Sequence, residues 1–168
     1  MIVCIDVDYK ESQAHVACLV FKNIKDAVPD RVYTILVNDI HDYIPGEFYK
    51  RELPCILKVL EIVEEKITLI IVDGYVWLDS NRRRGLGAYL YAHLHEKIPV
   101  IGVAKNKFKG SDHLGEVLRG ESQKPLYVTA AGLELETAMK MIDQMDGEFR
   151  FPTLLREVDQ QCRDWNNT

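Results

Sequence analysis

The sequence predicts an α/β fold with one mixed β-sheet, in which an antiparallel three-strand meander precedes parallel strands joined through helices. Three strand-like runs come first and are separated by short polar links, and apolar strands then alternate with amphipathic helices. The chain has 168 residues, of which 47% are hydrophobic and 28% charged, so it can bury a core without disulfides or a structural metal. We expect a single domain over residues 1–168.

The meander is predicted from three runs rich in β-branched and other apolar residues. They cover residues 2–7, 14–21 and 32–37. Short links, such as Val28-Pro29-Asp30, favour tight connections between them. Neighbouring runs should therefore pair in antiparallel fashion.

A helix follows the meander and should pack one apolar face on the sheet. Pro54 lies near its start, either in the first turn or at a kink. Five apolar residues recur at helical spacing. They are Leu53, Ile56, Leu57, Leu60 and Val63.

The second half of the chain predicts a βαβ unit and further helices. Residues 68–72 form an unbroken apolar run, typical of a strand buried on both faces; a helix over 85–96 and a strand over 100–104 follow. These two strands should be parallel. After a loop over 106–124 we expect a strand over 126–129, a helix over 134–145 and a last helix after Pro152.

Charge and cysteine usage limit the possible partners and compartments. With 21 Lys and Arg against 26 Asp and Glu, the net charge is −5, which excludes a basic coat over the whole surface but leaves a local basic groove open. The four cysteines form no Cys-x-x-Cys pair and lie mostly in apolar runs, which indicates buried thiols in a reduced compartment. No apolar run is long enough for a signal peptide or a membrane span. We expect a cytoplasmic protein without a membrane partner.

Two aspartates stand in strands that should be buried. Asp6 follows four apolar residues in the first strand, and Asp73 ends the run over 68–72. A buried carboxylate is costly unless it is hydrogen-bonded, ion-paired or bound to a cation. Ligands of open α/β sheets gather at the carboxyl ends of strands, where Asp73 lies. Both a turn-capping role and a functional role remain open on spacing alone.

Residues 42–52 combine a stiff turn, an aromatic ring and basic side chains. The turn is Tyr-Ile-Pro-Gly at 43–46, and Lys50, Arg51 and Glu52 follow at the start of the helix. An exposed aromatic ring beside basic residues fits a wedge that stacks on bases of a distorted duplex or a single strand. The alternative is a hydrophobic staple made by the aromatic residues at 43 and 48.

Two basic clusters could bind phosphate. Residues 82–84 are three arginines at the start of a helix, where guanidinium forks and backbone N–H groups both favour anions. Lys105 ends a strand beside the one that carries Asp73, so it could neutralise a scissile phosphate. The alternatives are a solvated charge run for the arginines and an ordinary surface lysine.

Taken together and in this order, the motifs resemble the endonuclease V family. The matching segments extend across nearly the whole chain and comprise residues 4–9, 42–52, 72–74, 82–87, 98–105, 127–129 and 150–152, with Arg156 and Asp159. The resemblance implies a ribonuclease H-like fold for the domain 1–168. It also implies a Mg²⁺-dependent endonuclease, with Mn²⁺ as a substitute metal. Its substrate would be DNA or RNA that contains a deaminated purine, hypoxanthine or inosine, and hydrolysis would occur at a phosphodiester bond 3′ of that base.

The resemblance also assigns roles to individual residues. The metal-binding carboxylates are Asp6, Glu52 and Asp73. The other catalytic positions are the late acid Asp159 and the phosphate-facing Lys105. The residues that contact the nucleic acid are the wedge Tyr43, Ile44 and Pro45, the glycines Gly46 and Gly74 that pack against the extruded base, Arg82, and Lys105.

The sequence departs from the family pattern after the Asp-Gly pair. The usual Gly-x-x-His-Pro-Arg is replaced by residues 75–82, which lack the histidine and add one residue. The metal set is thus retained while the base pocket is altered. This leaves two alternatives open, a non-catalytic nucleic-acid-binding module of the same fold and a nuclease with relaxed structure specificity. The preference for DNA or RNA, the number of metals and the oligomeric state stay undetermined.

Overall fold

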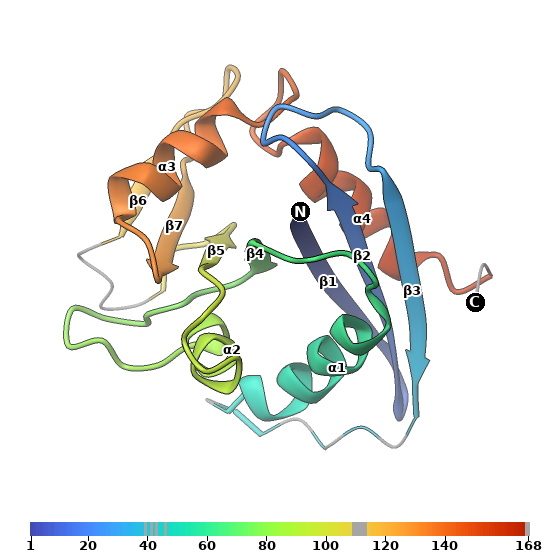
Figure 1. Ribbon diagram of the computed structural model, residues 1–168. Coiled ribbons are helices and arrows are strands. Elements are labelled where there is room, and N and C mark those ends of the chain that lie inside the picture. Colours follow the sequence, from blue (N-terminus) through green and yellow to red (C-terminus); the bar gives the residue numbers. More distant parts are fainter. Residues whose placement is uncertain (39, 41, 43, 46, 109–113, 167–168) are drawn as a thin grey trace.

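The computed structural model describes every residue except 39, 41, 43, 46, 109–113 and 167–168. Its centre is a seven-stranded sheet in the order β3-β2-β1-β4-β5-β7-β6 (Figure 1). The strands are β1 (Ile2–Lys10), β2 (Gln13–Phe21), β3 (Arg31–Val37), β4 (Leu69–Asp73), β5 (Val100–Ala104), β6 (Gly115–Val117) and β7 (Leu126–Ala131). The helices are α1 (Tyr49–Ile62), α2 (Leu86–His93), α3 (Leu135–Gln144) and α4 (Thr153–Arg163). In Figure 1, α1 and α2 cover one face of the sheet and α3 and α4 the other.

The pairing of the strands confirms the predicted mixed sheet. β1, β2 and β3 form an antiparallel meander, in which Ile2 pairs with Phe21 at one end of β1. β4 runs parallel to β1, and β5 runs parallel to β4. The two parallel connections pass through α1 and α2, as the alternation of strands and helices predicts.

The structure decides between the two positions expected for Pro54 and shows that one predicted loop is wrong. Pro54 lies inside α1, beyond its first turn, because the helix already begins at Tyr49. The expected loop over 106–124 contains β6, whose three residues are too few to show a strand pattern. β6 pairs with β7 in antiparallel fashion, and β7 also runs antiparallel to β5.

The sheet contributes side chains to two hydrophobic cores, one on each face, because successive side chains of a strand point to opposite faces. On β1, Cys4 joins the core under α3 and α4, whereas Val3 and Ile5 join the core under α1 and α2. This double burial explains the unbroken apolar runs of the central strands. All four cysteines are free and buried, which confirms the prediction of buried thiols.

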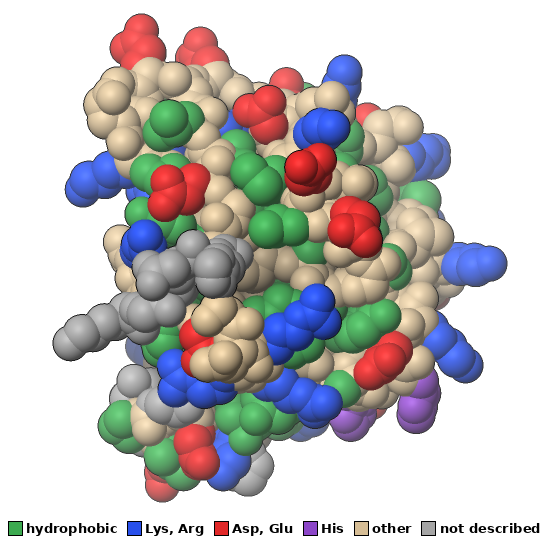
Figure 2. All heavy atoms as spheres, turned by 90° about the vertical axis from the view of Figure 1, so that its left-hand side faces the viewer, with side chains coloured by type: hydrophobic (Ala, Val, Ile, Leu, Met, Phe, Trp, Pro, Cys, Tyr) green, Lys and Arg blue, Asp and Glu red, His purple; other side chains and the backbone are tan. Residues whose placement is uncertain are grey.

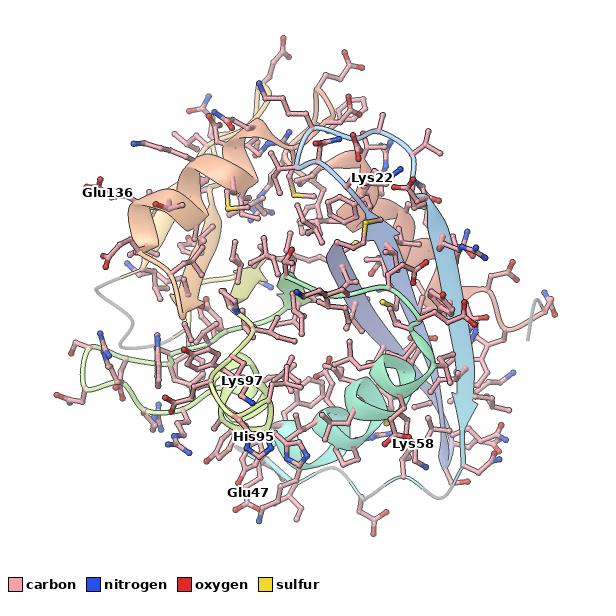
Figure 3. The ribbon with its side chains drawn as sticks, viewed as in Figure 1. Lys22, Glu47, Lys58, His95, Lys97 and Glu136 are labelled. Atoms are coloured by element: carbon pink, nitrogen blue, oxygen red, sulfur yellow. The ribbon has the colours of Figure 1, made fainter. Side chains whose placement is uncertain are left out.

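Charged side chains lie at the periphery of this arrangement. Figure 3 shows the labelled Lys22, Lys58 and Glu136 around the outside of the elements that enclose the cores. Among the described residues, no helix combines the length and the apolar character that crossing a membrane requires. Against this background, the buried Asp6 and Glu52 stand out.

Candidate active site

Parallel pairing brings Asp6, Asp73 and Lys105 to one edge of the sheet. Ile5 on β1 is in register with Val72 on β4, so the aspartates that follow them occupy adjacent positions on neighbouring strands. Residues in register on parallel strands point to the same face of the sheet. Lys105 comes directly after β5, the next strand along the sheet. The strand order thus explains why residues far apart in the sequence meet.

Two helices complete this group of charged side chains. Glu52 belongs to the first turn of α1, and Asp159 belongs to α4. The ammonium Nζ of Lys105 lies 3.5 Å from Oδ2 of Asp73 and 3.5 Å from Oδ1 of Asp159. Arg163 also reaches Asp159, with its Nη2 at 3.1 Å from the same oxygen. We call Asp6, Glu52, Asp73, Lys105 and Asp159 the acidic cluster.

Glu52 is the most deeply buried acid of the cluster, with 4% of its surface exposed. Its Oε2 atom has no hydrogen-bond partner among the described residues. Burial raises the pKa of Glu52 well above its ordinary value, and repulsion from Asp6 and Asp73 adds to this effect. A carboxylate in this setting is costly to hold in its charged form without a cation.

The two strand-end aspartates are perturbed in the same direction. Burial and the nearby Asp73 raise the pKa of Asp6 from 3.8 to about 7, although its Oδ1 accepts a hydrogen bond from the Val7 N–H at 2.8 Å. Burial also raises the pKa of Asp73, and this effect outweighs the attraction of Lys105. For Lys105, burial lowers the pKa, but Asp73 and Asp159 together outweigh it and hold the pKa above its ordinary value.

The three carboxylates Asp6, Glu52 and Asp73 fit a hard divalent cation. They supply only oxygen atoms, which are the ligands that Mg²⁺ and Mn²⁺ prefer. The unpaired Oε2 of Glu52 offers a ready acceptor, and mutual repulsion within the set would be relieved by positive charge. In the described part of the chain, no three His, Cys, Asp or Glu side chains already lie close enough to form a metal-binding group.

A cavity of about 310 Å³ opens beside Glu52 and Asp73. Gly74 lines this cavity, with a φ of +123° that favours glycine and no atom within 4 Å of where a Cβ would stand. Arg83 and Arg84 line it as well. The remaining walls are mainly aromatic and apolar, from Phe48, Tyr49, Tyr75, Leu78, Leu86 and Phe108. The cavity can take a flat, partly apolar group next to the acids.

The three consecutive arginines are exposed, and each lies near a different aromatic ring. The guanidinium carbon of Arg82 is 5.5 Å from the centre of the Trp77 ring, that of Arg83 is 5.4 Å from Phe108, and that of Arg84 is 5.9 Å from Tyr89. The segment that carries them projects to the left in Figure 1 and so belongs to the face in Figure 2. On that face, Lys and Arg side chains lie among acidic and hydrophobic ones, which fits a local basic region rather than a coat.

The three arginines line different hollows. Arg83 and Arg84 line the cavity beside Glu52 and Asp73. Arg82 lines a second hollow of about 290 Å³ with Trp77, on the side of β7 and the start of α3, and it shares a third hollow of about 310 Å³ with Arg84. Sequence reasoning selected Arg82 and missed Arg83, Arg84, Tyr75 and Phe108 as neighbours of the acidic cluster. The arginine run itself was visible, but its orientation depends on the fold.

The predicted wedge is described only in part. Tyr43 and Gly46 lie outside the described residues. Ile44 and Pro45 are exposed, and Ile44 lines a hollow with Tyr49 and Lys50 of α1. Ile44 therefore lies near Tyr49, which also lines the cavity beside Glu52 and Asp73.

Comparison with protein families relates the chain to known nucleases. The model of the Endonuclease V family matches residues 1–117. A protein named Endonuclease V from Trichormus variabilis is 30% identical over 175 residues, which cover 92% of this chain and 76% of that protein. Another from Streptomyces avermitilis is 30% identical over 141 residues. This alignment spans 72% of the present chain but only 60% of the length of that relative.

Solved structures confirm the fold. The crystal structure of the Endonuclease V from Streptomyces avermitilis superposes with a TM-score of 0.82 at 27% identity, covering 99% of this chain and 81% of that chain. The Endonuclease V of Ciona intestinalis, solved with a 24mer DNA that contains an inosine followed by a ribo-adenosine, gives a TM-score of 0.83 at 18% identity and covers 99% of this chain and 85% of that one. The expected ribonuclease H-like fold is therefore correct.

Proposed function

Because the chain belongs to the endonuclease V family of metal-dependent nucleases, we propose that it hydrolyses a phosphodiester bond 3′ of a deaminated purine in DNA or RNA. The observation that carries this proposal is the acidic cluster at one edge of the sheet, with a cavity directly beside it. The Ciona intestinalis protein, of the same fold, was crystallised with inosine-containing DNA. Hypoxanthine or inosine is accordingly the substrate base that we assign.

In this proposal Asp6, Glu52 and Asp73 hold Mg²⁺, or Mn²⁺ in its place. A bound divalent ion supplies Lewis-acid chemistry, lowers the pKa of water and stabilises the oxygen that leaves. Lys105 presents its ammonium to the phosphate, where a fixed positive charge favours the developing negative charge. Asp159 orients Lys105 by accepting from its Nζ at 3.5 Å. No side chain is needed as a nucleophile.

The nucleic acid lies across the cavity and the arginine segment. The cavity beside Gly74 receives the base, and its aromatic walls provide stacking surfaces. The turn at 43–46 keeps the strands apart once the base has left the stack, and the arginines at 82–84 bind phosphates. We also propose that residues 1–168 act as one domain. The free, buried cysteines suit the reducing cytoplasm.

The test is cleavage of end-labelled single-stranded and double-stranded DNA and RNA, each with and without one inosine, in Mg²⁺ or Mn²⁺ at low salt. The expected result is one discrete product beyond the 3′ side of inosine, absent with Asp73→Asn. Asp30→Asn serves as the matched control, because Asp30 is an exposed acid whose ion pair is with Lys22. Undiminished cleavage by Asp73→Asn would contradict the proposal.

A second candidate is a binding module that reads inosine without cutting the strand. It is favoured by residues 75–82, which replace the Gly-x-x-His-Pro-Arg pattern of the family and lack its histidine. Measured binding to the inosine strand in either metal, with no product after long incubation, would establish this candidate instead.

A further inference from the structure

Tyr75 ties the turn after β5 to the end of β4. Its hydroxyl donates a hydrogen bond to the carbonyl oxygen of Asn106 and accepts one from the N–H of Phe108 at 2.9 Å. Its ring also meets the Phe108 ring edge to face, with centroids 6.1 Å apart. One hydroxyl group therefore holds the backbone on both sides of Lys107, in the turn that begins at Lys105.

The same turn is held from the opposite side by the connection between α3 and α4. Nη2 of Arg150 donates to the carbonyl oxygen of Lys105 and, at 2.7 Å, to that of Pro125. The ring of Phe151 lies under the Lys105 ammonium, 4.8 Å from Nζ to the ring centre. Arg150 thus fixes the backbone at Lys105 itself, and Tyr75 fixes it at residues 106 and 108.

Lys105 depends on such support because its side chain is long, flexible and 38% exposed. Its two ion pairs, each at 3.5 Å, are loose and partly solvated. The place of its ammonium is therefore determined largely by where the backbone turn stands. A positive charge that stabilises a reacting phosphate has to be held in a precise position, since a displacement of about 1 Å can lower the rate a hundredfold.

We propose that Tyr75 is a positioning residue, whose hydroxyl fixes the turn over residues 105–108 so that the Lys105 ammonium stands beside Asp73 and Asp159. The inference rests on the proposed function, in which Lys105 faces the phosphate. Tyr75 opens the segment in which the sequence departs from the family pattern, and the resemblance assigns it no role. Residues 75–82, which replace the family pattern, therefore contribute to the site through the contacts of Tyr75 with the turn over residues 105–108.

The variant that tests this is Tyr75→Phe, which removes both hydrogen bonds but keeps the aromatic wall of the cavity. We expect the single-turnover cleavage rate to fall at least tenfold. The affinity for the inosine-containing strand, measured in EDTA, should stay the same. The Phe108 amide should exchange its hydrogen faster. Tyr33→Phe on β3, which removes a hydroxyl that donates to Glu65 away from the acidic cluster, should match the unmodified protein in all three measurements.

A double-mutant cycle with Lys105→Ala separates positioning from a general structural role. With protein in excess and long incubations, Tyr75→Phe should cause no further loss of rate in the Lys105→Ala background. An equal loss in both backgrounds would overturn the inference, because Tyr75 would then act through another group. An unchanged rate in the single Tyr75→Phe variant would overturn it as well. Failure of the unmodified protein to cut any inosine strand would instead overturn the proposed function.

Discussion

Replacing Asp6 by asparagine should make the metal-free protein more stable at pH 8 while abolishing cleavage. The folded protein raises the pKa of Asp6 from 3.8 to about 7. Each pKa unit corresponds to about 1.4 kcal/mol, so the charged form costs roughly 4 kcal/mol in the fold. Because the pKa is raised on folding, the stabilisation from protonated Asp6 is complete below pH 3.8 and lost as the pH rises through 7.

The asparagine side chain resembles the protonated acid at every pH and keeps an oxygen for the Val7 N–H, which donates to Asp6 at 2.8 Å. Burying the amide group has its own cost, so we expect a net gain of about 2–4 kcal/mol at pH 8. For a chain of this size that gain raises Tm by roughly 4–16 °C. At pH 5 the difference in stability between Asp6→Asn and the unmodified protein should shrink to less than half. Only the interval from 3.8 to 5 then contributes to the cost of Asp6 in the folded protein.

The assay is thermal unfolding followed by circular dichroism in EDTA at pH 5 and pH 8. Addition of Mg²⁺ at pH 8 should raise the Tm of the unmodified protein and leave that of Asp6→Asn nearly unchanged, since a ligand stabilises only the protein that binds it. Asp30→Asn, at an exposed position, should match the unmodified protein at both pH values and should keep the rise in Tm on addition of Mg²⁺. A lower Tm for Asp6→Asn at pH 8 in EDTA, or a gap that does not change with pH, would refute the reasoning.

Three further predictions follow from the same contacts. Glu52→Gln should raise Tm in EDTA at pH 8, because it removes a buried carboxyl group that the fold holds at a pKa well above its ordinary value, and should reduce the rise in Tm on titration with Mg²⁺. Arg119→Ala should lower the free energy of unfolding in urea by at least about 3 kcal/mol. The reason is that its buried guanidinium donates to five carbonyl oxygens at the end of α3 and before α4. An unchanged midpoint of urea unfolding would contradict this prediction. If Arg83 and Arg84 each contact one phosphate, Arg83→Ala and Arg84→Ala should each weaken the salt dependence of strand binding. The slope of log K against log[salt], measured by fluorescence anisotropy, should fall in magnitude by about one for each variant.

The strands that the sequence predicts best are those buried on both faces. β5 has the expected bounds, and β4 differs by one residue at each end, because unbroken apolar runs leave little choice of structure. β6 was missed because three residues carry no periodicity. The antiparallel direction of β7 depends on its hairpin-like connection through β6, which local patterns do not encode.

The residues of the candidate site also differ in whether the sequence alone can identify them. Asp6, Asp73 and Lys105 could be found from the sequence, because each stands in or just after an apolar strand where a charge needs a reason. Glu52 and Asp159 required the family resemblance, since their places depend on how α1 and α4 pack on the sheet. The contacts of Tyr75 with residues 106 and 108 join segments more than thirty positions apart and could be seen only in the fold.

These observations connect the charge of the cluster with the place of its lysine. Lys105 is shared between Asp73 and Asp159, each 3.5 Å from its ammonium. Neutralisation of Asp73 by a cation would weaken one of these two attractions and leave the ammonium to Asp159 and the Phe151 ring. The Lys105 side chain could then turn toward a phosphate while its backbone stays fixed. The hydrogen bonds of Tyr75 and Arg150 to residues 105–108 provide that fixed backbone, so the loss of either should slow cleavage even at saturating metal.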